Sequence, residues 1–235
     1  MIETRKLESR HGDVVLEGFV SAEAGASPRP GVLIFPNFLG LDGSDEKVGE
    51  RLAALGYVGF GCDLYGKGRR GTDRESGFAL MTPFREDRAF LQERMAALLE
   101  TARAQPEIDR DRIAAIGFCF GGLCVLDLAR SGAVLRGVAS FHGLLTPPDN
   151  IACPRITARV AVYHGWADAS VPPEQVVALG EELSKAGCDW QAHAYGGAVH
   201  GFTHLGDPDT DIPHNRLAAE RSWKSLEIFL AECFA

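Results

Sequence analysis

The stretch Ile113-Ala114-Ala115-Ile116-Gly117-Phe118-Cys119-Phe120-Gly121-Gly122 decides how this chain folds. Its first six residues are a continuous apolar run, which is the pattern of a short strand buried on both faces. The residues from Phe120 to Arg130 have the character of a helix. The segment between them, Gly-x-Cys-x-Gly-Gly, is the pattern of a sharp strand-to-helix turn that presents a nucleophile, with cysteine in the nucleophile position.

The spacing of the glycines around Cys119 has a physical cause. Side chains two residues before and after the turn would collide with the neighbouring strand and helix, so glycine is needed at 117 and 121. The turn would project the sulfur above the sheet, where the helix N-terminus favours a thiolate. The N–H of Phe120 is then available to a developing oxyanion. The alternative is a buried structural cysteine whose flanking glycines merely allow close packing.

Outward from this stretch, strand-like runs alternate with segments of helical period. The expected strands are Val14–Val20, Val32–Phe35, Tyr57–Cys62, Ile113–Phe118, Val138–Phe141, Val160–His164 and Trp190–Tyr195. The expected helices are Asp45–Leu55, one long helix from about Thr82-Pro83, Phe120–Arg130, Pro172–Ala186 and Pro213–Phe234, and Ala22–Pro30 is interpreted as a hairpin-type connection. This alternation predicts one α/β domain over residues 1–235, a mostly parallel sheet with helices on both faces.

Composition narrows the function classes. The chain has 235 residues, of which 46% are hydrophobic and 24% charged, so it can bury a core and is not disordered. A formal net charge of −8 disfavours nucleic acid as a partner. No apolar run is long enough for a membrane span and the start lacks a signal-peptide pattern, so we expect a cytoplasmic protein without membrane association. The six cysteines show no metal-ligand spacing and are expected to be free thiols.

The partners of Cys119 can be sought by chain order, since enzymes with this turn place an acid and then a histidine after later strands. Asp168 directly follows the expected strand Val160–His164, although it could be an ordinary loop or cap residue. His200 lies in a glycine-rich loop between the last strand and the closing helix. Of the seven histidines it has the right order and context, with His193, His204 and His214 as weaker rivals.

A second oxyanion donor is expected from the loop after the strand Val32–Phe35. That loop is Pro36-Asn37-Phe38-Leu39-Gly40, and we assign the donor to the backbone N–H of Phe38. A plain strand-to-helix turn is the alternative.

With these residues identified, the chain resembles the dienelactone hydrolase family of the α/β-hydrolase superfamily over nearly its whole length. The resemblance rests on GFCFGG at 117–122, HGWAD at 164–168, GGAVHGF at 196–202 and CDLYG at 62–66, and on the lack of an inserted lid domain. It implies a triad of Cys119, His200 and Asp168, oxyanion donors at Phe38 and Phe120, and a small-molecule ester or lactone as substrate.

Two positions depart from the family pattern. The family has a glutamate in the loop corresponding to 36–40, where this chain has Asn37, and an arginine four residues after the catalytic histidine, where this chain has His204. An amide cannot take the thiol proton, and an imidazole binds a carboxylate less firmly than a guanidinium does. The family's other arginine corresponds to Arg85 or Arg88, and the sequence does not choose between them.

The remaining expectations concern the pocket and the partners. Trp166, Phe38, Phe120 and His142 are candidate pocket walls, each of which could equally be plain packing. No metal and no organic cofactor is implied, and the chain is expected to be a monomer or a simple homo-oligomer. Two alternatives to a lactone-cleaving enzyme stay open: a general carboxylesterase or thioesterase, and a non-catalytic ligand-binding protein on a hydrolase scaffold.

Overall fold

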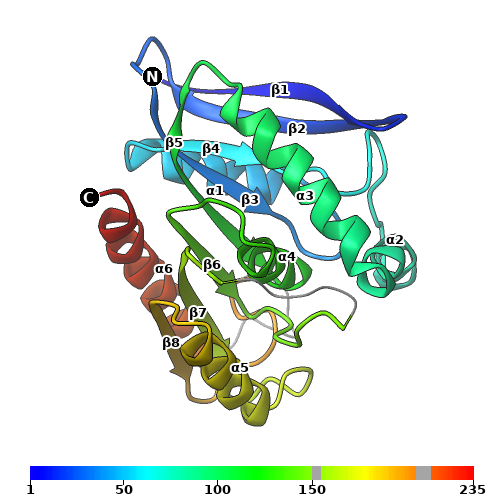
Figure 1. The fold of residues 1–235 in the computed structure, drawn as a ribbon, viewed down its shortest axis with the longest axis vertical. Helices are drawn as coiled ribbons and strands as arrows, with labels where there is room; N and C mark the ends of the chain where they lie inside the picture. The colour runs from blue at the N-terminus through cyan, green and yellow to red at the C-terminus, as the bar shows by residue number, and fades with distance from the viewer. Residues whose placement is uncertain (150–154, 205–212) are drawn as a thin grey trace.

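A twisted sheet forms the centre of the molecule in the computed structural model, which describes residues 1–149, 155–204 and 213–235 (Figure 1). In the described part of the chain the sheet has eight strands in the order β1-β2-β4-β3-β5-β6-β7-β8. The strands are β1 (Ile2–His11), β2 (Val14–Glu23), β3 (Arg29–Phe35), β4 (Val58–Gly61), β5 (Ile108–Phe118), β6 (Gly137–Phe141), β7 (Arg159–Gly165) and β8 (Trp190–Tyr195). The strands from β4 to β8 in this order are parallel, and the antiparallel β1–β2 hairpin joins β4.

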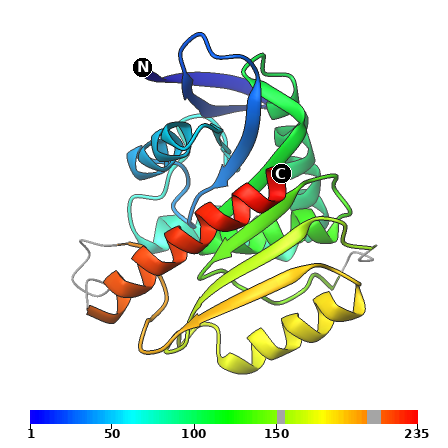
Figure 2. The ribbon, with the colours of Figure 1, turned by 90° about the vertical axis from the view of Figure 1, so that its left-hand side faces the viewer.

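Helices cover both faces of this sheet, as the alternating sequence pattern predicts. They are α1 (Gly43–Ala54), α2 (Arg74–Glu86), α3 (Arg88–Arg103), α4 (Phe120–Arg130), α5 (Pro173–Lys185) and α6 (Pro213–Phe234). One buried cluster lies under α3, α4 and α5, with Leu98, Val125 and Leu179 among its members. The other lies under α1 and α6, with Leu52 and Leu226, and Figure 2 shows α6 running across that face. This is an α/β-hydrolase-type arrangement, mostly parallel and covered on both sides.

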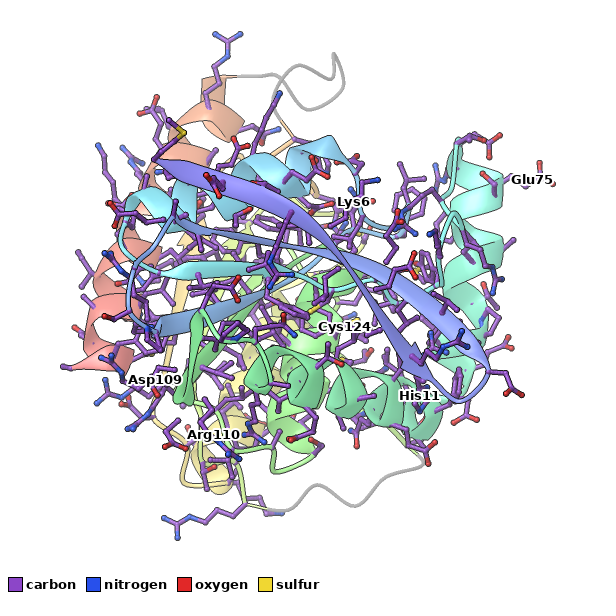
Figure 3. All side chains as sticks on the ribbon, turned by 90° about the horizontal axis from the view of Figure 1, so that it is seen from above. Lys6, His11, Glu75, Asp109, Arg110 and Cys124 are labelled. Carbon is purple, nitrogen blue, oxygen red and sulfur yellow. The ribbon has the colours of Figure 1, made fainter. Side chains whose placement is uncertain are left out.

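Side chains differ in how far they lie from the sheet. Cys124 of α4 is fully buried, whereas the labelled side chains of Glu75, Asp109 and Arg110 lie at the edge of the molecule (Figure 3). No helix among the residues described is both long and apolar enough to cross a bilayer.

The helix expected to begin near Thr82-Pro83 is a wrong prediction. Two helices occupy this segment, since α2 already begins at Arg74 and α3 follows it after Asp87. Asp73 caps α2 by accepting from the Ser76 N–H, and Asp87, at ψ 86°, accepts from the Phe90 N–H and starts α3. These caps compete with helix propagation, and Pro83 is accommodated inside α2.

The N-terminal region also differs from expectation. The segment Ala22–Pro30 is not a hairpin connection, because β4 lies between β2 and β3 in the sheet. Strand β1 is not predicted from the sequence. It is an edge strand whose side chains are mostly exposed, so it has no apolar alternation for a pattern to detect.

Gly121 lies where the first turn of α4 comes close to the end of β3, beside the turn at Cys119. A Cβ at Gly121 would lie 2.0 Å from the carbonyl oxygen of Phe35. We expect Gly121→Ala to lower the free energy of unfolding by about 3 kcal/mol or more, because the backbone of Phe35 and Pro36 must move. Gly43→Ala, at a position with open space around it, is the matched control and should change stability by less than about 1 kcal/mol. Urea unfolding measures both, and equal midpoints for the two variants would contradict the packing argument.

Candidate active site

Cys119 occupies a strained turn between β5 and α4. Its φ of 53° lies in the left-handed region, which non-glycine residues rarely adopt, and its ψ is −112°. Its N–H donates to the carbonyl of Phe141 at the end of β6, at 3.0 Å. A Cβ at Gly117 would lie 2.0 Å from the carbonyl oxygen of Gly121, so both glycines flanking the turn are sterically required. The strain is therefore held in place by packing on every side.

Two hydrogen bonds connect the sulfur of Cys119 to a buried carboxylate. His200 Nε2 lies 3.1 Å from Cys119 Sγ, and His200 Nδ1 lies 2.8 Å from Asp168 Oδ2. Asp168 is 3% exposed, and its second oxygen accepts the N–H of Ser170 at 2.8 Å. The three residues come from the ends of β5 and β7 and from the loop after β8. The structure thus brings together the three side chains that chain order singles out.

The loop that carries His200 is tied to its neighbours on both sides. The N–H of Val199 donates to the side-chain oxygen of Asn215 on α6, at 3.0 Å. The carbonyl of Ala198 accepts the N–H of Ala167 at 2.8 Å, which joins this loop to the one that carries Asp168. The histidine and its acid are therefore held at a fixed separation by backbone contacts as well as by their own hydrogen bond.

The electrostatics favour a protonated His200. Burial lowers the pKa of His200, but the hydrogen bonds to Asp168 and Cys119 and the charges of both outweigh it and raise the pKa to about 10. A group with this pKa holds its proton at neutral pH. The arrangement therefore supports an imidazolium beside the sulfur.

The two expected oxyanion donors come from the start of α4 and from the loop after β3. Phe120 is the first residue of α4, and the first N–H groups of a helix have no partner within it. Phe38 is flanked by fixed groups. Asn37 accepts the N–H of Leu39 with its side chain at 2.8 Å, and its carbonyl accepts that of Gly40 at 3.1 Å. The Tyr65 hydroxyl donates to the carbonyl of Phe38 at 2.9 Å, so the peptide on that side is also held.

A cavity of about 580 Å³ opens above Cys119 and His200. Its other lining residues are mostly apolar, namely Phe38, Phe78, Met81 and Leu144, with Arg74, Arg85 and Ser170. Its size suits a small organic molecule, and its wall combines apolar surface with two cationic groups.

Arg85 and Arg88, between which the sequence does not choose, have different surroundings in the structure. Arg85 lines the cavity, whereas Arg88 is buried against Asp127, with its Nε 2.5 Å from the carboxylate. Arg88 also donates to the carbonyl of Thr146 at 3.2 Å, so it supports the loop after Leu144. Arg74, which is not among the residues predicted from the sequence, lines the cavity as well. The sequence-based prediction missed Arg74 because it started the helix near Thr82. The cap at Asp73 is the signal that places Arg74 in the first turn of α2.

Asn37 and His204 contact each other rather than the cavity above Cys119. The side-chain nitrogen of Asn37 lies 3.1 Å from His204 Nε2, and both residues line an adjacent cavity of about 210 Å³. Asp45 also lines this second cavity, and burial raises its pKa to about 7. The contact joins the loop of Phe38 to the loop of His200.

The three other candidate pocket walls have different positions. Phe120 and His142 are fully buried, and Trp166 is 48% exposed with its ring 6.3 Å from that of His164. None of the three is among the described residues that line the cavity above Cys119.

The other thiols differ from Cys119 in their surroundings. Cys62, Cys119, Cys124, Cys188 and Cys233 are free, while Cys153 lies outside the described residues. Burial raises the pKa of the Cys62 and Cys124 thiols well above the ordinary value. It also raises the pKa of Cys188 to about 11 and that of Cys233 to about 12. These four are therefore protonated at neutral pH.

Comparison with known proteins points to one family. The sequence model described as the dienelactone hydrolase family matches residues 16–234. A dienelactone hydrolase-like promiscuous phosphotriesterase from metagenomic libraries has a similar structure, with TM-score 0.93, 35% identity and coverage of 100% of this chain and 99% of the other. An uncharacterised protein of Caenorhabditis elegans is 37% identical over 62% of this chain and 95% of its own length. A Synechocystis protein provisionally named a carboxymethylenebutenolidase is 23% identical over 96% of this chain and 95% of its own length.

Iodoacetamide labelling tests the charge state of the site. At about pH 6.5 an ordinary thiol is almost wholly protonated and unreactive, but Cys119 Sγ lies 3.1 Å from His200 Nε2, and a cationic imidazole at this distance makes a thiol more reactive. We expect Cys119 to be labelled at least about tenfold faster than Cys188, measured by peptide mass spectrometry. His200→Gln should abolish the difference, because it removes the imidazolium. Equal labelling of Cys119 and Cys188 in the parent would contradict the prediction.

Proposed function

The chain belongs to the dienelactone hydrolase family, and from this premise we propose that it cleaves carboxylic esters or lactones with the thiolate of Cys119. The observation that carries the proposal is the hydrogen-bonded series of Cys119 Sγ, His200 and Asp168, with separations of 3.1 and 2.8 Å. A nucleophile, a base within hydrogen-bond reach and a third group that orients the base are the signature of covalent catalysis.

In the first half-reaction, the Cys119 thiolate attacks the carbonyl carbon and a C–S bond forms. The carbonyl electrons move to the oxygen, where the N–H groups of Phe38 and Phe120 stabilise the charge. Such donors contribute about 3–4 kcal/mol each to transition-state stability. The C–O bond then breaks, and the His200 imidazolium donates its proton to the departing alkoxide or enolate.

In the second half-reaction, water releases the acid from the thioester. His200, now neutral, takes a proton from the attacking water. The C–S bond breaks as the tetrahedral intermediate collapses, and Cys119 returns to a thiolate beside a protonated His200. Asp168 keeps Nδ1 as the donor in both steps, so Nε2 always faces the sulfur and the substrate.

The walls of the cavity favour a class of substrate. Thiolate is itself a good leaving group from a tetrahedral intermediate, so productive substrates need a leaving group at least as good. Enol lactones, aryl esters and thioesters meet this requirement, and amides do not. The apolar side chains of Phe38, Phe78 and Met81 suit an aromatic or unsaturated group, and Arg74 and Arg85 suit an anionic substituent.

The alternatives differ in what they require of the same site. A general carboxylesterase or thioesterase would act on aryl esters and thioesters with no preference for lactones. A non-catalytic ligand-binding protein would hold an ester in the cavity without turnover. The hydrogen-bonded sulfur favours an enzyme over a binding protein, because a binding site has no need of an activated nucleophile.

A second candidate activity is phosphotriester hydrolysis, because the similar metagenomic protein is named as a promiscuous phosphotriesterase. The chemistry would be parallel. The Cys119 sulfur would attack phosphorus, the phosphoryl oxygen would occupy the oxyanion site, an aryloxide would leave, and water would cleave the S–P bond. The same cavity would hold the aryl groups.

A substrate panel with nucleophile variants tests the proposal. We expect the parent to hydrolyse an enol lactone and p-nitrophenyl acetate, and Cys119→Ala to lower kcat/KM by about 10⁴-fold, since the attacking atom is lost. Cys119→Ser should lower it by at least about 10²-fold, because a hydroxyl is not ionised at neutral pH. Initial rates in the same panel, extended to thioesters and an aryl phosphotriester, rank the substrate classes.

Cys188→Ala is the matched control, since it removes another partly buried thiol away from the cavity. Turnover by Cys119→Ala at the parent rate would contradict the mechanism. A parent that binds the aryl ester but shows no turnover would favour the non-catalytic alternative.

A further inference from the structure

We propose that His142 is a positioning residue, which holds the loop of the catalytic histidine in place through Thr203. The proposal rests on the function proposed for Cys119 and His200, and it assigns a role to a histidine that belongs to neither the triad nor the cavity wall. Three observations support it, namely the backbone position of His142, its side-chain contacts and its charge.

The backbone of His142 joins the strands that carry the nucleophile and the acid. It directly follows β6, where the carbonyl of Phe141 accepts the Cys119 N–H at 3.0 Å. Its own N–H donates to the carbonyl of Tyr163 on β7 at 2.8 Å. With a φ of 38°, it shares with Cys119 a feature found at no other non-glycine residue in the described part of the chain. Strain of this kind persists where the surroundings over-determine it, and it gathers at functional sites.

The side chain of His142 reaches the loop that carries His200. Its Nε2 lies 2.7 Å from the hydroxyl oxygen of Thr203. Its ring packs edge-on against the rings of His200, at 5.4 Å, and Phe202, at 5.2 Å. With 0% exposure, His142 cannot contact a substrate, so its contacts are all with the catalytic loop and its surroundings.

Thr203 anchors this loop on the side of His200 opposite to Val199. Val199, one residue before His200, is held by Asn215 at 3.0 Å, and Thr203, three residues after it, is held by His142. The ring of His200 must stay 3.1 Å from Cys119 Sγ and 2.8 Å from Asp168 at once. A displacement of about 1 Å at a catalytic group costs roughly 10²-fold in rate. Anchors on both sides of His200 are what limits such displacement.

A neutral ring is required at this place, because His200 carries a positive charge next to it. Burial lowers the pKa of His142 well below its ordinary value, and electrostatic interaction with the neighbouring imidazoles, that of His200 above all, lowers it further, while an interaction with its own backbone raises it. The nearby carboxylate of Asp168 is hydrogen-bonded to His200 and not to His142. His142 is therefore uncharged at neutral pH. Thr203 is the hydrogen-bond partner of Nε2, and Nδ1 has no hydrogen-bond partner among the described residues.

A double-mutant cycle tests the pair. His142→Phe keeps an aromatic ring in the buried site and removes the hydrogen bond, and Thr203→Val removes the hydroxyl with little change of shape. If the two residues act through one bond, each single variant lowers kcat by about tenfold and the double variant lowers it no further. KM should stay within about twofold of the parent value, since neither residue touches the cavity. Thr203→Ser and His142→Gln, which can keep the bond, should retain most of kcat.

A second readout separates positioning from general damage to the fold. The pH midpoint of Cys119 alkylation reports how well His200 stabilises the thiolate. We expect it to rise in His142→Phe and in Thr203→Val, and to stay at the parent value in Thr203→Ser. A change in the folded fraction alone would alter the amplitude and leave the midpoint in place. If His142→Phe does not fold, the comparison of Thr203→Val with Thr203→Ser tests the proposal by itself. Thr203 is only partly buried, so these two substitutions are better tolerated by the fold.

The outcomes distinguish the two proposals. Losses that multiply to about a hundredfold in the double variant, or single variants with the parent kcat and midpoint, would overturn the role of His142 while Cys119 remains the nucleophile. A parent in which Cys119 is not selectively alkylated would overturn the proposed function itself.

Discussion

The close approach of three backbone segments around Cys119 is the constraint on which the rest of the site depends. Gly117 and Gly121 let β5, α4 and the end of β3 come together, with no room for a side chain at either glycine. This contact holds Cys119 at a φ of 53°, at the carboxyl edge of the sheet and the first turn of α4. In parallel sheets, that edge is where loops of successive strands meet. The loops of Phe38, Asp168 and His200 therefore meet at the edge of the sheet where the sulfur lies.

Among the groups around the sulfur, His200 is the one whose electrostatic surroundings favour a positive charge. His200 lies between Cys119 and Asp168, with a pKa raised to about 10, so a positive charge stands beside the sulfur. The histidines next to it do not add to this charge, because burial lowers the pKa of both His142 and His164. Asn37 stands where the resemblance suggests a carboxylate, and it contacts His204 rather than the sulfur. Among the described residues, His200 lies within hydrogen-bond distance of the sulfur, whereas Asn37 accepts the N–H of Leu39 within the loop of Phe38.

The sequence predicts the central part of this arrangement because the relevant signals are local. The glycine spacing at 117–122 specifies the turn, and chain order selects Asp168 and His200 from many candidates. Signals that depend on tertiary context were missed. β1 is an exposed polar edge strand, and the start of α2 depends on a cap at Asp73 that competes with a proline-based start. The choice between Arg85 and Arg88 requires the helix break at Asp87, and the contact of His142 with Thr203 joins residues 61 positions apart.

Direct detection of a covalent intermediate tests the central claim most closely. The protein would be mixed with an equimolar amount of an activated aryl ester, quenched in acid within the first turnover, digested and mapped by mass spectrometry. The mechanism predicts one acyl group, held as a thioester on the peptide that contains Cys119, which forms and decays at rates consistent with turnover. Consumption of the ester with no adduct at any time, or with the acyl group on another side chain, would contradict it.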